Sequence, residues 1–256
     1  MKIATWNVNG IRARKDEVAA FVEQEQPDVL CLQEIKVATG HIPKAICELP
    51  GYHCCWHGMK GYSGVALHVR KEWAPAPPGF VYPDFDHETR IVVADLGRLR
   101  VASVYVPNGG KDYAAKIRFL HAMEAYAASV RALGKELVVC GDLNVARERR
   151  DVHPSERDER LICQRPEERA LFERILAAGQ LHDVGRDLDP TIDELFSWWA
   201  PWRGLRERNV GWRLDYVLAS SGLAARAVSS PSLRRTGTSD HAPVMVTFED
   251  ATSTTP

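Results

Sequence analysis

Short apolar runs rich in strand-forming residues alternate with longer segments of helical periodicity, and this alternation restricts the fold more than any other feature of the chain. The run Val29–Leu32 is typical of a strand that is buried on both faces. The segment 14–25, in contrast, places Val18, Phe21 and Val22 at helical spacing. We therefore expect a layered α/β domain in which helices cover β-sheets.

The expected strands share an apolar, β-forming composition and are bounded by turn residues; they are Ile3–Val8, Val29–Leu32, 52–57, 64–69, Ile91–Leu96, Leu99–Val106, Leu137–Cys140, Leu214–Ala219 and Val244–Phe248. The expected helices are 14–25, 112–132 and 166–179. Gly97 and Arg98 join two strands as a hairpin, and hairpins among helices favour mixed sheets over purely parallel ones. The proline-rich stretch 75–79 is expected to be a loop.

The length and the charge balance restrict the class of protein. The chain has 256 residues, which suits one large domain or two small ones. Because no linker is evident, we expect a single domain over residues 1–250 and a disordered tail over 251–256. Lys and Arg number 33 against 34 Asp and Glu, so any site for a polyanion must be a local patch.

Membrane and disulfide signals are weak. No apolar run reaches the roughly 18 residues of a membrane span, and residues 1–10 lack the apolar centre of a secretory leader. The six cysteines show neither a CxxC pair nor zinc-site spacing. We expect reduced thiols, a cytoplasmic location and a monomer without membrane contact.

Polar side chains collect at the ends of six expected strands; they are Asn7, Glu34, Tyr105 with Asn108, Asp142 with Asn144, Asp215, and Asp240 with His241. If these ends converge, they form a site of oxygen ligands with one imidazole, which suits Mg²⁺ or Mn²⁺ better than zinc. Each residue taken alone also fits an ordinary turn, loop or solvated charge. Composition does not decide between the two interpretations.

Aromatic and basic residues interleave over residues 196–213. This stretch holds four of the seven tryptophans and four arginines against one glutamate. Rings that stack and arginines that meet phosphate are what a nucleic-acid surface requires. For Trp198 and Trp199 the alternative is core packing.

Seven motifs in order resemble those of the exonuclease III family of apurinic/apyrimidinic (AP) endonucleases, within the DNase I-like superfamily; they are Trp6–Ala13, Leu32–Lys36, Gly61–Ala66, Tyr105–Asn108, Gly141–Asn144, Asn209–Tyr216 and Ser239–Pro243. The resemblance implies a four-layer α/β sandwich, with two packed mixed β-sheets flanked by helices. It implies Mg²⁺-dependent hydrolysis 5′ to abasic sites in double-stranded DNA, with Mn²⁺ as a possible substitute. Whether 3′–5′ exonuclease or 3′-phosphatase activity accompanies it is left open.

The resemblance implies a set of metal ligands; they are Asn7, Glu34, Asp142, Asn144, Asp240 and His241. Glu34 is the expected direct ligand, and Asn7 would orient or share the ion. Asp240 is the candidate at a second metal position. The number of ions in the reaction is left open.

The resemblance also implies catalytic roles for Tyr105, Asp142, Asn144, Asp215 and His241. Asp142 is expected to act as general base, and Asn144 to hold the attacking water or the phosphate. His241 is expected to stabilise the phosphorane, with Asp215 fixing its ring. Tyr105 either donates to the phosphate or acts as a phenolate base, so the identity of the base is also open.

The implied substrate-binding residues are Asn108, Lys111, Trp198, Trp202, Arg203, Trp212 and Leu214. Trp198, Trp212 and Leu214 would wall a pocket for a flipped abasic sugar and exclude a base by size. Asn108 would contact a phosphate. Trp202 or Arg203, and Lys111, would probe the duplex, although Lys111 also fits an exposed loop charge.

Two other classes of function share part of this pattern. An inositol-polyphosphate phosphatase or a sphingomyelinase-type phosphodiesterase would share the metal and histidine chemistry, but not the tryptophan-rich stretch before Asp215. A non-catalytic DNA-binding protein on this scaffold would lack Glu34, Asp142 or His241, and all three are present.

Overall fold

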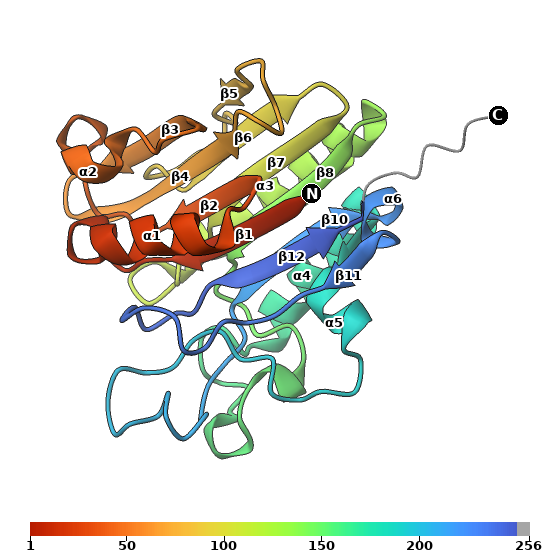
Figure 1. Cartoon of the computed structure of the whole chain (residues 1–256). Coiled ribbons are helices and arrows are strands. Elements are labelled where there is room, and N and C mark those ends of the chain that lie inside the picture. The colour runs from red at the N-terminus through yellow and green to blue at the C-terminus, as the bar shows by residue number, and fades with distance from the viewer. Residues whose placement is uncertain (250–256) are drawn as a thin grey trace.

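The computed structural model describes residues 1–249, so the predicted tail 251–256 lies outside the described residues. Two six-stranded sheets pack against each other, and helices cover their outer faces (Figure 1). The predicted four-layer α/β sandwich with mixed sheets is confirmed.

The first sheet has the order β11-β12-β1-β2-β4-β3. Its strands are β1 (Lys2–Asn7), β2 (Val29–Gln33), β3 (Tyr52–Met59), β4 (Tyr62–Arg70), β11 (Ala227–Ser229) and β12 (Val244–Phe248). The second sheet has the order β5-β6-β7-β8-β10-β9. Its strands are β5 (Gly79–Val81), β6 (Ile91–Leu96), β7 (Leu99–Tyr105), β8 (Glu136–Asp142), β9 (Leu181–Asp183) and β10 (Asp215–Ser220).

The helices form the two outer layers. They are α1 (Ile11–Glu25), α2 (Lys44–Cys47), α3 (Tyr113–Ala132), α4 (Pro166–Gly179), α5 (Val184–Leu188) and α6 (Ser221–Ala224), with short 3₁₀ turns at Thr39–His41, Arg149–Asp151 and Pro154–Glu156. Apolar residues of α1 and α2 pack on the first sheet, and those of α3 and α4 pack on the second. A third apolar cluster fills the space between the sheets.

Most expected elements are present, with shifted ends. The helix expected over 14–25 begins at Ile11, directly after Gly10. The φ of Gly10 is 103°, which glycine adopts readily and other residues rarely adopt. The loop expected over 75–79 ends in β5, a three-residue strand at the sheet edge. The sequence interpretation also missed β9 and β11, because strands of three residues are too short to show a hydrophobic period.

A polar link crosses the otherwise apolar space between the sheets. Thr5 Oγ1 donates to Gln33 Oε1 at 3.1 Å, and Gln33 Nε2 donates to Ser103 Oγ at 3.2 Å. All three side chains are fully buried. Satisfied polar groups in an apolar layer favour one register over its alternatives, so this link fixes how the two sheets meet.

The strand directions bring the polar strand ends to one edge of the sandwich. β1 runs parallel to β2, and β7 runs parallel to β8, so their carboxyl ends lie together. Within the second sheet, Asp142 pairs with Tyr105 on one side and with Asp215 on the other. The convergence that composition left open is thus a property of the fold.

Over the described residues, no helix is both long and apolar enough to cross a membrane. All six cysteines are free thiols, as expected from their spacing.

Candidate active site

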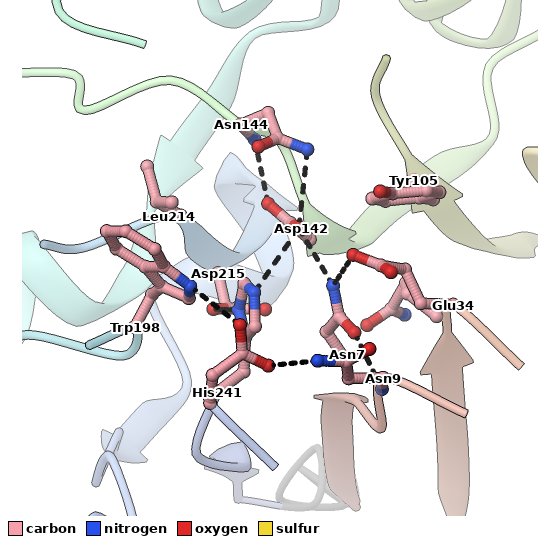
Figure 2. Close-up of polar contacts among 12 residues, drawn as sticks. Asn7, Asn9, Glu34, Tyr105, Asp142, Asn144, Trp198, Leu214, Asp215 and His241 are labelled. Atoms are coloured by element: carbon pink, nitrogen blue, oxygen red, sulfur yellow. Dashed lines mark hydrogen bonds and ion pairs between the residues drawn. The ribbon is translucent and has the colours of Figure 1, made fainter. Parts of the chain in front are cut away.

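Two carboxylates and one imidazole form the centre of the site (Figure 2). Glu34, Asp142 and His241 each offer a ligand atom, and these atoms lie within 4.8 Å of one another. Glu34 follows β2, Asp142 ends β8, and His241 precedes β12, so both sheets contribute. Asp142 and His241 are almost completely buried, whereas Glu34 is partly open to the cavity.

Two asparagines hold the carboxylates in place. The side-chain amide of Asn7, at the end of β1, donates to Glu34 Oε1 and to Asp142 Oδ2, both at 2.9 Å. Asn144 donates through its backbone N–H to Asp142 Oδ1 at 2.9 Å and through Nδ2 to Asp142 Oδ2 at 3.3 Å. Asp142 is therefore fixed from both sides, with its carboxylate facing His241.

A chain of hydrogen bonds supports His241 from behind. Its Nδ1 lies 2.8 Å from Asp215 Oδ2, and the Ser197 hydroxyl donates to the same oxygen at 2.7 Å. The other ring nitrogen, Nε2, lies 3.8 Å from Asp142 Oδ2. The carboxylate of Asp215 thus orients the ring so that Nε2 points toward the site.

The buried charges shift one another's protonation. Burial raises the pKa of Asp142 to about 7, against the attraction of His241. Burial alone would lower the pKa of His241, but the carboxylates of Asp215 and Asp142 outweigh it and raise that pKa to about 10. Burial also opposes the ionisation of Glu34, yet hydrogen bonds from Asn7 and Lys36 leave its pKa below the ordinary value.

Tyr105 borders Glu34 and Asp142 at the end of β7. Burial, followed by the negative charges of Glu34 and Asp142, raises the pKa of its hydroxyl well above the ordinary value. The phenolate is therefore strongly disfavoured. Of the two roles left open for Tyr105, this direction of the pKa favours the hydrogen-bond donor over the phenolate base.

A cavity of about 700 Å³ opens beside these groups. Trp198, Trp212 and Leu214 form one wall, and the two indole rings meet edge-on at a centroid distance of 5.4 Å. Trp199, in contrast, is 1% exposed and belongs to the core, which is the alternative considered for it. Trp198 and Trp212 keep part of their surface open to the cavity.

Asp240 and Asn108 also line the cavity, but with partners of their own. Asp240 accepts hydrogen bonds from Asn9 Nδ2 at 2.8 Å and from Trp198 Nε1 at 3.1 Å. The bond to Trp198 orients that ring in the pocket wall. Asn108 Nδ2 donates to Asn144 Oδ1 at 3.2 Å, which places it at the cavity's edge.

Three of the residues expected to contact substrate lie outside this cavity. Lys111 lines a neighbouring cavity of about 510 Å³ and lies 5.1 Å from the centroid of the Tyr62 ring. Trp202 is 59% exposed on the 200–208 loop, and Arg203 is exposed beside it. The fold therefore does not bring these three residues to the catalytic group.

One wall of the cavity was missed by the sequence interpretation. It consists of Arg160, Leu161, Ile162, Cys163 and Arg165. Leu161, which is exposed and lies between Arg160 and Arg165, could have indicated a ligand-binding loop. The acidic residues on both sides made the segment resemble an ordinary charged loop. Burial raises the pKa of Cys163 to about 12, so its thiol is held in the protonated form.

The donor set at the centre suits a hard divalent cation. Glu34 and Asp142 supply carboxylate oxygens, and their facing negative charges need a counter-charge. The nearby ring nitrogen of His241 binds a metal only when the imidazole is neutral. In the structure the Lys36 ammonium supplies part of it, with its Nζ 2.7 Å from Glu34 Oε2, and the neutral Asn7 amide adds a hydrogen bond. The residues present therefore fit a metal ion of the Mg²⁺ or Mn²⁺ type.

Comparison with known proteins places the chain among nucleases. The pattern of the Endonuclease/Exonuclease/phosphatase family matches residues 4–241. The chain is 34% identical to Exodeoxyribonuclease III of Haemophilus influenzae over 97% of this chain and 100% of that protein. It is 33% identical to Recombination repair protein 1 of Drosophila melanogaster over 97% of this chain, but spans only 37% of that longer protein.

Solved structures agree with these relatives. An AP endonuclease from Archaeoglobus fulgidus superposes with a TM-score of 0.88 at 31% identity, covering 98% of this chain and 100% of that one. A 3′ phosphatase from Neisseria, solved with a product DNA hairpin, superposes with a TM-score of 0.87 at 30% identity over the same shares of the two chains.

Proposed function

The chain belongs to the endonuclease/exonuclease/phosphatase family, among DNA-repair nucleases of the exonuclease III and AP endonuclease type, and we propose that it incises duplex DNA 5′ to abasic sites. It is a phosphodiester hydrolase, which disfavours a purely DNA-binding role. A role toward inositol phosphates or sphingolipids likewise finds no support among these relatives.

The observation that carries the proposal is the aromatic wall beside the catalytic group. Trp198, Trp212 and Leu214 line the same cavity as Asp142 and His241. Rigid rings there would exclude a base while admitting a bare sugar, so a flipped abasic nucleotide fits the site by size. Extrusion of such a nucleotide also requires no unstacking of a base.

The protein groups divide the hydrolysis among them. Asp142, held by Asn7 and Asn144, would take the proton from the attacking water. His241, kept charged by Asp215, would offset the charge that develops on the phosphate. Tyr105 would donate a hydrogen bond to a phosphate oxygen. The products would be a 3′-hydroxyl and a 5′-deoxyribose phosphate.

Glu34 and Asp142, with Asn7 beside them, would hold the divalent ion, because a charged His241 has no lone pair for a metal. Bound there, the ion would supply Lewis-acid stabilisation of the phosphate and the leaving oxygen. Because Asp240 accepts a hydrogen bond from the Trp198 ring, we also propose an indirect role for it, in which it orients Trp198.

The test compares duplexes that carry one tetrahydrofuran abasic analogue, a recessed 3′-end or a 3′-phosphate. With Mg²⁺, we expect the highest kcat/KM on the abasic duplex and a 3′-hydroxyl product, and chelator should abolish the reaction. Asp142→Asn should lower kcat about 10²-fold or more while DNA binding persists.

The matched control is Asp95→Asn, a carboxylate bonded to Lys135 at the far side of the second sheet. This variant should keep full activity. Incision that survives chelator, or an Asp142→Asn enzyme with near wild-type kcat, would contradict the proposed chemistry. Activity confined to 3′-ends would instead assign the site to exonuclease or 3′-phosphatase function.

A further inference from the structure

A fully buried ion pair lies behind the active-site cavity. Lys116 of α3 and Glu168 of α4 approach with an Nζ–Oε1 distance of 2.5 Å, and both side chains are 0% exposed. Neither residue lines the cavity, and neither has a part in the chemistry proposed above.

The ammonium of Lys116 contacts backbone from the site as well as Glu168. It donates to Asn144 O at 2.6 Å and to Asn108 O at 3.2 Å, and its Nζ lies 3.7 Å from Cys163 Sγ. These three residues all line the cavity. One buried cation therefore joins three loops that are far apart in the sequence.

The backbone at each of these loops departs from ordinary geometry. Asn144 and Cys163 have φ values of 49° and 72°, and Gly109, next to Asn108, has 93°. Left-handed backbone at non-glycine residues persists only where surrounding contacts enforce it. A Cβ on Gly109 would lie 3.0 Å from Lys116 Cδ, so the lysine stem also packs closely against this loop.

Helix stability does not account for the lysine. Lys116 lies in the first turn of α3, where the helix dipole disfavours a cation. A buried ion pair is also poor evidence of stabilisation, because desolvation of both charges offsets their attraction. Its contacts with the two carbonyls are what an apolar side chain of the same size could not supply.

Glu168 secures the third loop. Its Oε1 accepts from Cys163 N at 3.0 Å, and its Oε2 accepts from Arg165 N at 2.9 Å. It thereby holds the cavity wall at 160–165 against the ammonium. Asn144, clamped through its carbonyl, in turn donates twice to Asp142.

We propose that Lys116 is a positioning residue, whose buried ammonium holds the Asn108 and Asn144 loops in the geometry that the general base and the phosphate contact require. This inference deepens the proposed function, since it concerns the same site. It makes the buried pair a determinant of turnover rather than of substrate binding.

The test uses Lys116→Met, which keeps the length of the side chain and removes the charge. We expect kcat to fall about 10²-fold, because small displacements of catalytic groups have effects of that size. The dissociation constant for uncleaved abasic duplex, measured in chelator, should change less than about threefold. Lys135→Met, which removes the partly buried partner of Asp95, is the matched control and should leave both values unchanged.

A double variant distinguishes two causes of a lower kcat, namely loss of stability and loss of positioning. Lys116→Met leaves the Glu168 carboxylate buried without a counter-charge, so its melting temperature should fall. Lys116→Met with Glu168→Gln removes both charges and should recover melting temperature but not kcat. A double variant with recovered stability and wild-type kcat would overturn the proposal.

The variants are compared on whichever duplex the wild type cleaves fastest. If the wild type ignores the abasic duplex but processes 3′-ends, the proposed substrate is wrong, and the kcat of the variants on 3′-ends still tests Lys116. If the wild type incises the abasic duplex and the double variant does so equally fast, only the role of Lys116 is wrong.

Discussion

His241 owes its charge to neighbouring carboxylates, of which Asp215 has the largest effect. Asp215 Oδ2 lies 2.8 Å from the ring Nδ1, and Ser197 bonds the same oxygen from the opposite side. In the described structure the second oxygen, Oδ1, is buried and has no hydrogen-bond partner. The carboxylate is therefore held in one orientation, toward the imidazole.

Asp215→Asn should lower the pKa of His241 from about 10, because the strongest of the charges that raise it is removed. An opposite charge at this distance shifts a pKa by about 1–3 units, so the ring should lose its proton about that much earlier as pH rises. NMR titration of His241 in the metal-free protein checks the shift. We also expect a fall in kcat, and the losses of Asp215→Asn and His241→Asn should be far from additive. An unchanged His241 titration would show that the two residues do not act together.

At the scale of the secondary-structure elements, the junction between β7 and β8 sets the position of Asp142. Gly141 precedes Asp142 with a φ of 152°, and a Cβ there would lie 1.8 Å from Val104 O. Only glycine fits between these two central strands. The last residue of β8 therefore reaches the cavity because the residue before it has no side chain.

Gly141→Ala should destabilise the fold by about 1–3 kcal/mol or more, as expected of overpacking against backbone that has little room to yield. It should also lower kcat, because the end of β8 must move away from β7. Urea denaturation and turnover measure the two effects. Gly40→Ala, with nothing within 4 Å of the added Cβ, is the control and should match the wild type. A stable, fully active Gly141→Ala enzyme would contradict the close approach.

The strand ends were predictable, and the loops between them were not. Asn7, Glu34 and Asp142 follow apolar runs. Parallel pairing brings the strand ends together within each sheet, and the packing of the two sheets brings Asp142 to Asn7 and Glu34. The wall at 160–165 gave no such signal, because its shape depends on a distant residue, Lys116, that reads in sequence as an ordinary helical lysine.

The sequence likewise does not predict which hydrogen-bond partners and surroundings the polar and aromatic loop residues have. Asp240 follows the metal-site pattern, and in the folded chain one of its oxygens accepts from Asn9 and the other from Trp198, which the pattern does not indicate. Trp198 and Trp199 are neighbours of the same type, but one lines the cavity and the other is core. The hydrogen-bond partners and the burial of these residues depend on the direction in which each side chain points. In a loop that has no regular hydrophobic pattern, the composition does not predict that direction.

At the scale of the whole molecule, one buried histidine links stability to pH. His68 of β4 is 0% exposed beside the Trp56 ring, and within the described residues neither of its ring nitrogens has a hydrogen-bond partner. Burial lowers its pKa from 6.5 to about 3. The native state therefore keeps the ring neutral over a range in which the unfolded chain binds a proton.

This difference predicts a loss of stability in acid. Between pH 6.5 and about 3 the unfolded state holds one proton more at this position, so the free energy of unfolding falls as pH falls. The contribution is at most about 1.4 kcal/mol per pH unit. His68→Leu should remove it, and urea denaturation across this range should give a shallower pH dependence for the variant. Parallel curves for the two proteins would show that His68 is not the source.

The pairing of the first strand with the last has a consequence for the time at which activity arises. In the first sheet β1 is bonded to β12, with Lys2 opposite Thr247, and His241 enters the site just before β12. During synthesis the N-terminal part of the chain leaves the ribosome first, and the chain grows at about 5–20 residues per second. Almost the entire chain must therefore be synthesised after Asn7 before His241 is available to complete the site. A nascent or truncated chain without β12 and His241 should therefore be unable to hydrolyse DNA, and activity should begin only when this segment has joined the first sheet.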